Sequence, residues 1–248
     1  MTPYYQDDAV TLYHGDCREI LPMLGPVDHV ITDPPYEAEA HQLGRRAFSG
    51  RSNAAHPKGI AEERPLGFAA ITDADRKLVG PLMAAKSRGW VLVFCQVEAA
   101  MLWREAMKPA KYVRTQIWRK PDGAPQFTGD RPGMGYESIV SCWAGEGRSR
   151  WHGGGRHGVY EHMTVKAAAH QTQKPEALMS ELVSLFTDPD HVILDPFGGS
   201  GTTAVAAKKL GRRCIVIERD EKHCETTAAR LAIRFEHIEG GLFSDQIA

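Results

Sequence analysis

The strongest constraint on the fold is the alternation of short apolar runs with segments of helical periodicity along the 248 residues. Runs rich in β-branched and aromatic residues predict strands at 10–13, 27–32, 90–94, 113–118, 138–143, 191–194 and 214–217. Helical spacing predicts helices at 17–24, 72–88, 97–107, 175–186, 202–210 and 220–235. This alternation is typical of an α/β fold with a doubly wound, mostly parallel sheet, in which ligands bind beyond the carboxyl ends of the strands.

Two long segments interrupt this pattern and lack periodicity. They span residues 37–70 and 144–170 and are rich in Gly, Arg and His. A loop of that length within a compact domain is usually functional or disordered. The chain length fits one domain, 1–248, so we interpret both segments as insertions in it.

Positive charge is concentrated in three segments although the whole chain has a formal net charge of −1. Segments 41–64, 104–131 and 144–174 carry net charges of +3, +4 and +3. A single charged run is often only a solvated surface. Three of them on an otherwise acidic chain predict a one-sided basic surface, which is what phosphate binding requires.

Cysteine usage and hydropathy point to a cytoplasmic setting. None of the five cysteines stands in a CxxC pair, so neither a disulfide scaffold nor a zinc ribbon is expected. No signal peptide is recognisable, and no stretch reaches the roughly 20 apolar residues of a membrane span.

A glycine-rich turn follows the strand predicted at 191–194 and opens the next predicted helix. It includes Asp195, Phe197, Gly199, Ser200, Gly201, Thr202 and Thr203. Glycines let the backbone approach a ligand, and a helix start presents unpaired N–H groups to it. Glu218 ends the following strand, where an acid can bind ribose hydroxyls. No lysine follows the glycines, which excludes a P-loop. The turn therefore predicts an adenosine-containing cofactor and leaves NAD, FAD and S-adenosylmethionine open.

The tetrapeptide Asp33-Pro34-Pro35-Tyr36 follows the strand predicted at 27–32. Two prolines fix the backbone and remove two donors, which leaves rigid carbonyl acceptors. Asp33 and the carbonyl of Pro34 can each accept a proton of an exocyclic amine, and Tyr36 can stack on a base. A base bound in this way must first leave the duplex. We interpret the four residues as catalytic.

Together, the two motifs resemble those of the amino-group DNA methyltransferases. The order, with the catalytic motif first and the glycine motif late, resembles the β arrangement of that family, a circularly permuted methyltransferase sheet. The resemblance implies S-adenosylmethionine as cofactor and double-stranded DNA as substrate. By matching family motifs, it also implies cofactor contacts at Asp16, Cys17, Lys174 and Glu218, and it marks Tyr136-Glu137 as a later motif.

The aspartate at position 33 resembles the adenine-N6 type, so we expect adenine as the target. Cytosine-N4, RNA and protein amide targets are the alternatives within methyltransferases. Carbon-5 cytosine chemistry requires a nucleophilic cysteine beside a proline, and no cysteine here follows proline. Outside the methyltransferases, an NAD-dependent oxidoreductase and an inactive DNA-binding regulator are the alternatives.

The basic segments supply candidate DNA contacts but no expected metal site, because their histidines lack regular ligand spacing. The candidates are Arg45, Arg46, Arg51, Lys58, Arg119, Lys120, Arg148, Arg150, Arg156 and His157. Because the two insertions are short for reading a full DNA site, we expect a homodimer. A partner restriction endonuclease is compatible with the resemblance.

Overall fold

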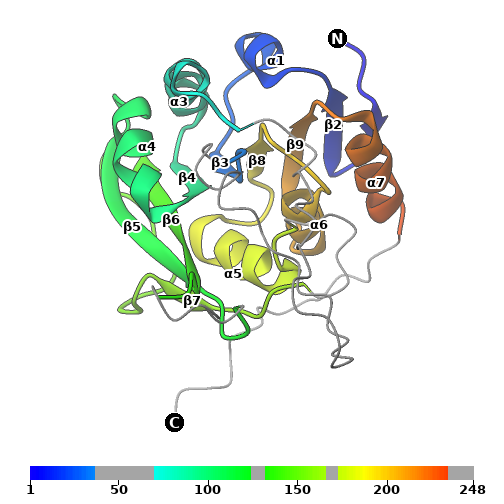
Figure 1. Ribbon diagram of the computed structural model, residues 1–248. Helices are drawn as coiled ribbons and strands as arrows, with labels where there is room; N and C mark the ends of the chain where they lie inside the picture. Colours follow the sequence, from blue (N-terminus) through cyan, green and yellow to red (C-terminus); the bar gives the residue numbers. More distant parts are fainter. Residues whose placement is uncertain (37–69, 124–131, 166–172, 234–248) are drawn as a thin grey trace, which may run out of the picture.

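A computed structural model of the chain describes residues 1–36, 70–123, 132–165 and 173–233 (Figure 1). Its strands are β1 (Tyr5–Gln6), β2 (Val10–His14), β3 (His29–Thr32), β4 (Trp90–Cys95), β5 (Lys111–Arg119), β6 (Tyr136–Trp143), β7 (Val159–Glu161), β8 (Val192–Asp195) and β9 (Arg213–Glu218). Its helices are α1 (Cys17–Met23), α3 (Asp73–Lys86), the 3₁₀ helix η1 (Val97–Ala99), α4 (Ala100–Ala106), α5 (Glu176–Phe186), α6 (Thr202–Lys209) and α7 (Glu221–Leu231).

The strands described form one sheet in the order β1-β2-β9-β8-β3-β4-β6-β5-β7. The central strands β2, β9, β8, β3 and β4 are parallel, whereas β6 runs antiparallel to both β4 and β5. The predicted doubly wound, mostly parallel α/β sheet is therefore confirmed. From β3 the chain continues to β4 on one side, and from β8 to β9 on the other. The strand order thus reverses between β3 and β8, at the position where α/β sheets bind ligands.

Helices cover both faces of the sheet (Figure 1). On one face α5, α6 and α7 pack together over a core that includes Leu178, Leu182 and Val205. On the other face α1, α3 and α4 cover a second core built around Met83 and Trp103. The sheet lies between the two cores, so its central strands are buried on both sides. This burial explains why β4 is apolar throughout.

Local signals account for where the helices begin. Asp16 caps α1 by accepting from the Arg18 N–H at 2.9 Å. Thr72 and Asp75 form a reciprocal capping box at α3. The proline predicted inside the helix at 175–186 instead occupies the N-cap, which leaves α5 to start at Glu176.

Several predicted boundaries differ from the structure. Val27 makes only an isolated bridge to Ser87, so β3 begins at His29. The helix predicted at 97–107 is split into η1 and α4, and neither start has a side-chain cap. The helix predicted at 220–235 ends at Leu231, within the described residues.

A strand that the sequence did not predict lies in segment 144–170, which we predicted to be irregular. It contains β7, which adds to the free edge of β5 in parallel. Because three residues of mixed polarity carry no detectable period, only the neighbouring strand reveals β7 as a strand. Segment 37–70 lies outside the described residues except for its last residue.

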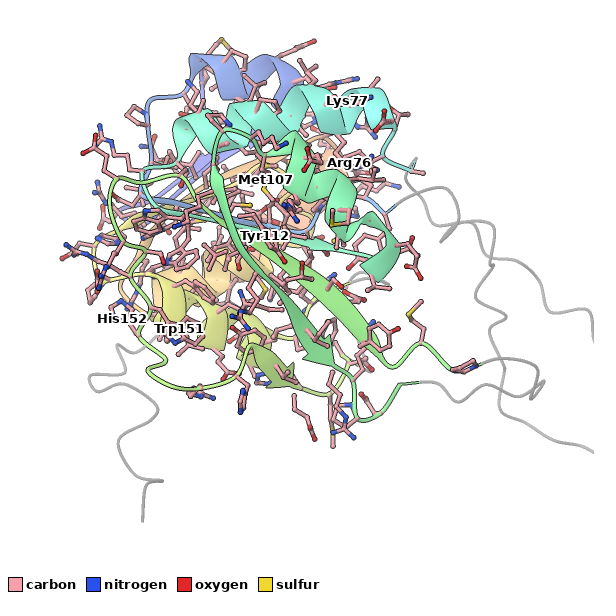
Figure 2. All side chains as sticks on the ribbon, turned by 90° about the vertical axis from the view of Figure 1, so that its left-hand side faces the viewer. Arg76, Lys77, Met107, Tyr112, Trp151 and His152 are labelled. Atoms are coloured by element: carbon pink, nitrogen blue, oxygen red, sulfur yellow. The ribbon has the colours of Figure 1, made fainter. Side chains whose placement is uncertain are left out.

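The described part of segment 144–170 packs against α5. The Trp151 ring lies 4.9 Å from that of Phe186, and the His152 N–H donates to the Leu185 carbonyl at 3.0 Å. Figure 2 shows Trp151 and His152 on this segment, well away from Arg76 and Lys77 of α3. Within the described residues, no helix is both long and apolar enough to cross a membrane. The five cysteines are free and buried.

Candidate active site

The site is built at the carboxyl ends of β3 and β8, where the strand order reverses. Thr32 ends β3, and its hydroxyl donates to Asp195 Oδ1 of β8 at 2.7 Å. The N–H of Phe197 donates to the same oxygen at 3.2 Å. Burial raises the pKa of Asp195 to about 6, although hydrogen bonds from Thr203 and Thr32 oppose this rise. Asp195 therefore ties the two strand ends together and fixes the start of the glycine turn.

Asp33, the next residue after β3, belongs to a cluster of ionic and polar groups in which Lys174 is buried and the other members are half-buried. We call Asp33, Tyr36, Lys120, Glu137 and Lys174 the buried ion cluster. Lys174 Nζ lies 2.5 Å from Asp33 Oδ2 and 3.2 Å from Glu137 Oε2. The Tyr36 hydroxyl donates to Glu137 Oε2 at 2.5 Å, and Lys120 forms an ion pair with Glu137 Oε1. Two carboxylates thus face two ammonium groups around the tyrosine ring.

The sheet topology brings these five residues together from distant positions in the sequence. Lys120 directly follows β5, and Glu137 lies near the start of β6, opposite the end of β5. Because β6 runs antiparallel to its neighbours, its start lies at the same edge as the carboxyl ends of β3, β4 and β5. Lys174 arrives from the segment that leads into α5.

Burial and charge act against each other within the buried ion cluster. Burial raises the pKa of Asp33, and the Lys174 ammonium opposes that rise. Burial would also raise the pKa of Glu137, but Lys174 and Lys120 outweigh it and hold that pKa at about 2. Although burial lowers the pKa of Lys174, the two carboxylates raise it above its ordinary value. Glu137 therefore remains ionised across the physiological pH range.

One oxygen of the Asp33 carboxylate is distinct from the other. Oδ1 is buried and has no hydrogen-bond partner among the described residues, while Oδ2 accepts from Lys174. A buried polar atom without a partner is costly in a folded protein and requires an explanation. An acceptor of this kind beside an aromatic ring is suited to an incoming amine.

The glycine turn forms a second part of the site, next to the buried ion cluster. Gly199 and Gly201 have φ values of +52° and +77°, in the left-handed region that other residues rarely adopt. A Cβ at Gly201 would meet Thr227 Cγ2 at 2.5 Å. The Gly199 N–H donates to Glu218 Oε2 at 2.7 Å, and the Asp220 N–H donates to Oε1 at 2.7 Å. The predicted turn and acid are therefore in direct contact.

Asp16 lies beside Glu218, as a shared ligand would require. His14 of β2 is in register with Glu218 of β9, and the Gly15 N–H donates to the Glu218 carbonyl at 2.9 Å. Asp16 also forms a 2.5 Å ion pair with Arg18. The acids Asp16, Glu218, Asp195 and Asp33 thus follow or end four neighbouring strands at one edge of the sheet.

The remaining predicted cofactor residues lie at the same edge with their side chains partly or wholly buried. Ser200, Thr202 and Thr203 are buried at the start of α6, and Phe197 is half-buried against the core. The thiol of Cys17 is buried, which raises its pKa to about 12. Arg230 holds the turn from outside by donating to the Ser200 carbonyl at 2.5 Å.

The structure separates the predicted DNA-binding residues rather than gathering them. Arg119 forms an ion pair with Glu161, Arg156 pairs with Glu181 at 2.8 Å, and His157 is exposed. Lys120 is only 10% exposed in its contact with Glu137, a placement that sequence reasoning did not foresee. Arg45, Arg46, Arg51 and Lys58 lie outside the described residues.

Arg148 and Arg150 lie at the opposite edge of the sheet from the buried ion cluster. They line a cavity of about 420 Å³ together with His29 and His191, which begin or precede β3 and β8. The His29 and His191 rings are joined by a 3.0 Å hydrogen bond, and burial lowers the pKa of His29 to about 4. Among the described residues, no group of three or more His, Cys, Asp or Glu is arranged to hold a metal ion.

Sequence reasoning missed the central role of Glu137 and put Lys174 with the cofactor contacts alone. The available signals were the Tyr136-Glu137 motif and Lys120, which directly follows the strand β5. Neither signal reveals that an antiparallel strand returns Glu137 to the edge that carries Asp33.

Residues 27–229 match the family model described as DNA methylase, the family of N6 and N4 methyltransferases. The match extends over most of the chain and includes both Asp33-Pro34-Pro35-Tyr36 and the glycine turn. This protein therefore belongs to the N6/N4 DNA methylase family. It is an amino-group DNA methyltransferase that depends on S-adenosylmethionine, as the sequence resemblance implied.

Individual relatives agree with this assignment. The Type II methyltransferase M2.LlaDCHI of Lactococcus lactis subsp. cremoris is 26% identical, over 92% of this chain and 91% of its own length. The crystal structure of the M1.HpyAVI–SAM complex matches with a TM-score of 0.66 at 22% identity, covering 90% of this chain and all of that one. The cytosine-N4-specific PvuII DNA methyltransferase matches with a TM-score of 0.70 at 15% identity, covering 94% of this chain and 89% of its own.

Proposed function

We propose that this methyltransferase acts on the N6 amine of adenine in double-stranded DNA, with the base rotated out of the helix. The observation that carries the proposal is Asp33 Oδ1, which is buried and has no partner among the described residues. Tyr36 lies near it, because Lys174 Nζ contacts both Asp33 and the Tyr36 hydroxyl. An exocyclic amine donates one hydrogen to Asp33 Oδ1 and the other to the carbonyl of Pro34. Tyr36 stacks on the face of the base.

In this account, the protein contributes mainly orientation and a water-free site. S-adenosylmethionine, when bound, supplies a methyl group already activated by its sulfonium. The amine nitrogen forms the new N–C bond as the C–S bond breaks, and the electron pair of that bond stays on sulfur. The nitrogen is positively charged until it loses a proton, and the ionised Asp33 stabilises that charge.

The residues at the strand ends fit the cofactor. We propose that Glu218 binds the ribose hydroxyls and that Asp16, which follows the neighbouring strand, binds the adenine amine. The left-handed glycines bring the backbone at Gly199 and Gly201 close to the ligand.

The target base is tested by expressing the protein in a bacterium free of DNA methylation and sequencing its DNA for modified bases. N6-methyladenine at a defined site supports the proposal. N4-methylcytosine would overturn it in favour of the specificity that the PvuII enzyme's name states. An Asp33→Ala culture is the matched control and should show no modified base.

Light scattering with and without DNA tests the expected homodimer, and a monomer in both states would contradict it.

Cofactor binding provides a separate prediction. Glu218→Ala should weaken S-adenosylmethionine binding by roughly 1.5–3 kcal/mol, since it removes hydrogen bonds to a charged group. Titration calorimetry measures this loss directly. Glu221→Ala is the matched control, because Glu221 lies in the first turn of α7 and should leave the affinity unchanged. An unchanged affinity for Glu218→Ala would refute the ribose role.

A further inference from the structure

A single lysine makes the two oxygens of the Asp33 carboxylate differ in their contacts. Lys174 Nζ donates to Oδ2 at 2.5 Å, and Oδ1 is buried without a partner in the part of the chain that the structure describes. A carboxylate that is free to rotate would exchange its two oxygens. With one oxygen held by an ammonium, the other has a fixed direction. The contact from Lys174 therefore determines which oxygen an incoming amine meets.

Lys174 is itself held firmly enough to serve as an anchor. Its side chain is 7% exposed, and Nζ lies 3.2 Å from Glu137 Oε2 and 3.3 Å from the Tyr36 hydroxyl. The same nitrogen is 5.1 Å from the centre of the Phe94 ring. Because Pro175 caps α5 directly after it, its backbone is fixed by the helix start. The ammonium can contact Asp33 and Tyr36 at once without any rearrangement.

We propose that Lys174 is a positioning residue for methyl transfer, whose ammonium orients the Asp33 carboxylate toward the target amine. This inference rests on the proposed role of Asp33 in the reaction. It differs from the cofactor role that the sequence resemblance implied for Lys174. Among the described residues, the polar contacts of Lys174 are with Asp33, Glu137 and Tyr36, and not with the glycine turn.

The charges around Asp33 give the proposal a measurable consequence. Burial and Glu137 disfavour ionisation of Asp33, and the Tyr36 hydroxyl already donates its hydrogen to Glu137. Lys174 and the more distant Lys120 favour ionisation. Removing Lys174 leaves a buried carboxylate facing like charges, so the pKa of Asp33 must rise. The reaction needs the ionised form, and its rate must then fall on the acid side.

The test is the single-turnover rate of methyl transfer to DNA between pH 5 and 9. Lys174→Met, which has a similar length without the charge, should move the acid limb of the profile upward by about 1–3 pH units. Lys174→Arg keeps the charge and should leave the limb within about half a unit of wild type. Lys120→Met is the matched control: it removes an ammonium that contacts Glu137 and not Asp33, so the shift should be smaller than for Lys174→Met.

Affinity for S-adenosylmethionine, measured on the same variants, separates the competing explanations. The proposal expects Lys174→Met to bind the cofactor within about twofold of wild type. An unmoved acid limb with weakened cofactor binding would overturn it and restore the cofactor role. An unmoved limb with unchanged affinity would also overturn it and leave a structural role only.

Two further outcomes are distinguishable. If wild-type protein itself fails to methylate DNA, the proposed function fails, and cofactor titration still reports whether the fold is intact. If Lys174→Met does not fold, Lys174→Gln replaces it, because a neutral amide can still donate to Asp33. An acid limb that stays at the wild-type position in Lys174→Gln would contradict the proposal.

Discussion

The Asp33 carboxylate shows how much one residue depends on its neighbours. Its identity places a proton acceptor after β3, but its two oxygens differ, because Lys174 binds Oδ2 and Oδ1 has no partner among the described residues. Glu137 does the same for Tyr36, whose hydroxyl it binds at 2.5 Å. This hydrogen bond limits the rotation of the Tyr36 side chain.

Asp33→Ala should lower the methyl-transfer rate by at least about 10²–10³, because one preorganised group that stabilises developing charge is lost. Cofactor affinity should change little, since in the proposed function Asp33 contacts the target base and not the cofactor. Single-turnover kinetics and calorimetry measure the two effects. A near wild-type rate for this variant would mean that the active site lies elsewhere.

Tyr36→Ala should lose about 1–3 kcal/mol of base stacking, which appears as weaker productive DNA binding. Tyr36→Phe keeps the ring and loses only the bond to Glu137, so it should keep much of the activity. The same assay compares the two variants. Equal loss in both would show that the hydroxyl, rather than the aromatic face, carries the function.

Among the elements, α3 shows most directly how a short sequence pattern determines a helix start. The Thr72 hydroxyl accepts from the Asp75 N–H at 3.0 Å, and the Asp75 carboxylate accepts from the Thr72 N–H in return. The sequence predicted this start from Thr72, Asp73 and Asp75. The helix packs on α1 and α4, on the face of the sheet opposite α5.

Thr72→Ala should therefore lower the free energy of unfolding by about 1 kcal/mol. Denaturant unfolding followed by circular dichroism measures the change. Thr72→Ser retains the capping hydroxyl and serves as the control, with little loss expected. Stability equal to wild type in Thr72→Ala would show that packing alone determines where α3 begins.

At the scale of the whole molecule, the two edges of the sheet, at the carboxyl ends and at the amino ends of the parallel strands, carry different charged groups. The buried ion cluster and the four strand-end acids lie at the carboxyl ends of the parallel strands, whereas Arg148 and Arg150 line the cavity at their amino ends. If duplex binds at the edge that carries Asp33, as we propose, these two arginines lie at the opposite edge of the sheet from it. Three other basic candidates, Arg45, Arg46 and Arg51, follow Asp33-Pro34-Pro35-Tyr36 in the chain.

DNA affinity should fall steeply with salt despite the nearly neutral chain. Each lost phosphate contact should reduce the log–log salt slope by about 0.9, so the triple change of Arg45, Arg46 and Arg51 to Ala should reduce it clearly. Arg148→Ala with Arg150→Ala should leave the slope unchanged because of its position. Fluorescence anisotropy across a salt series measures both. A reduced slope only for the second variant would reverse the assignment of the DNA face.

By itself, the sequence determined the α/β class, most of the strands and helices, and the two motifs at strand ends. These follow from local periodicity, proline and glycine geometry, and capping, which act over a few residues. It did not determine β7, the role of Glu137 or the contact between Lys174 and Asp33. Those depend on strand order and on the antiparallel return of β6, which bring distant residues to one edge. Only the tertiary structure decided which charges would be buried together, because burial and pairing are properties of the assembled sheet.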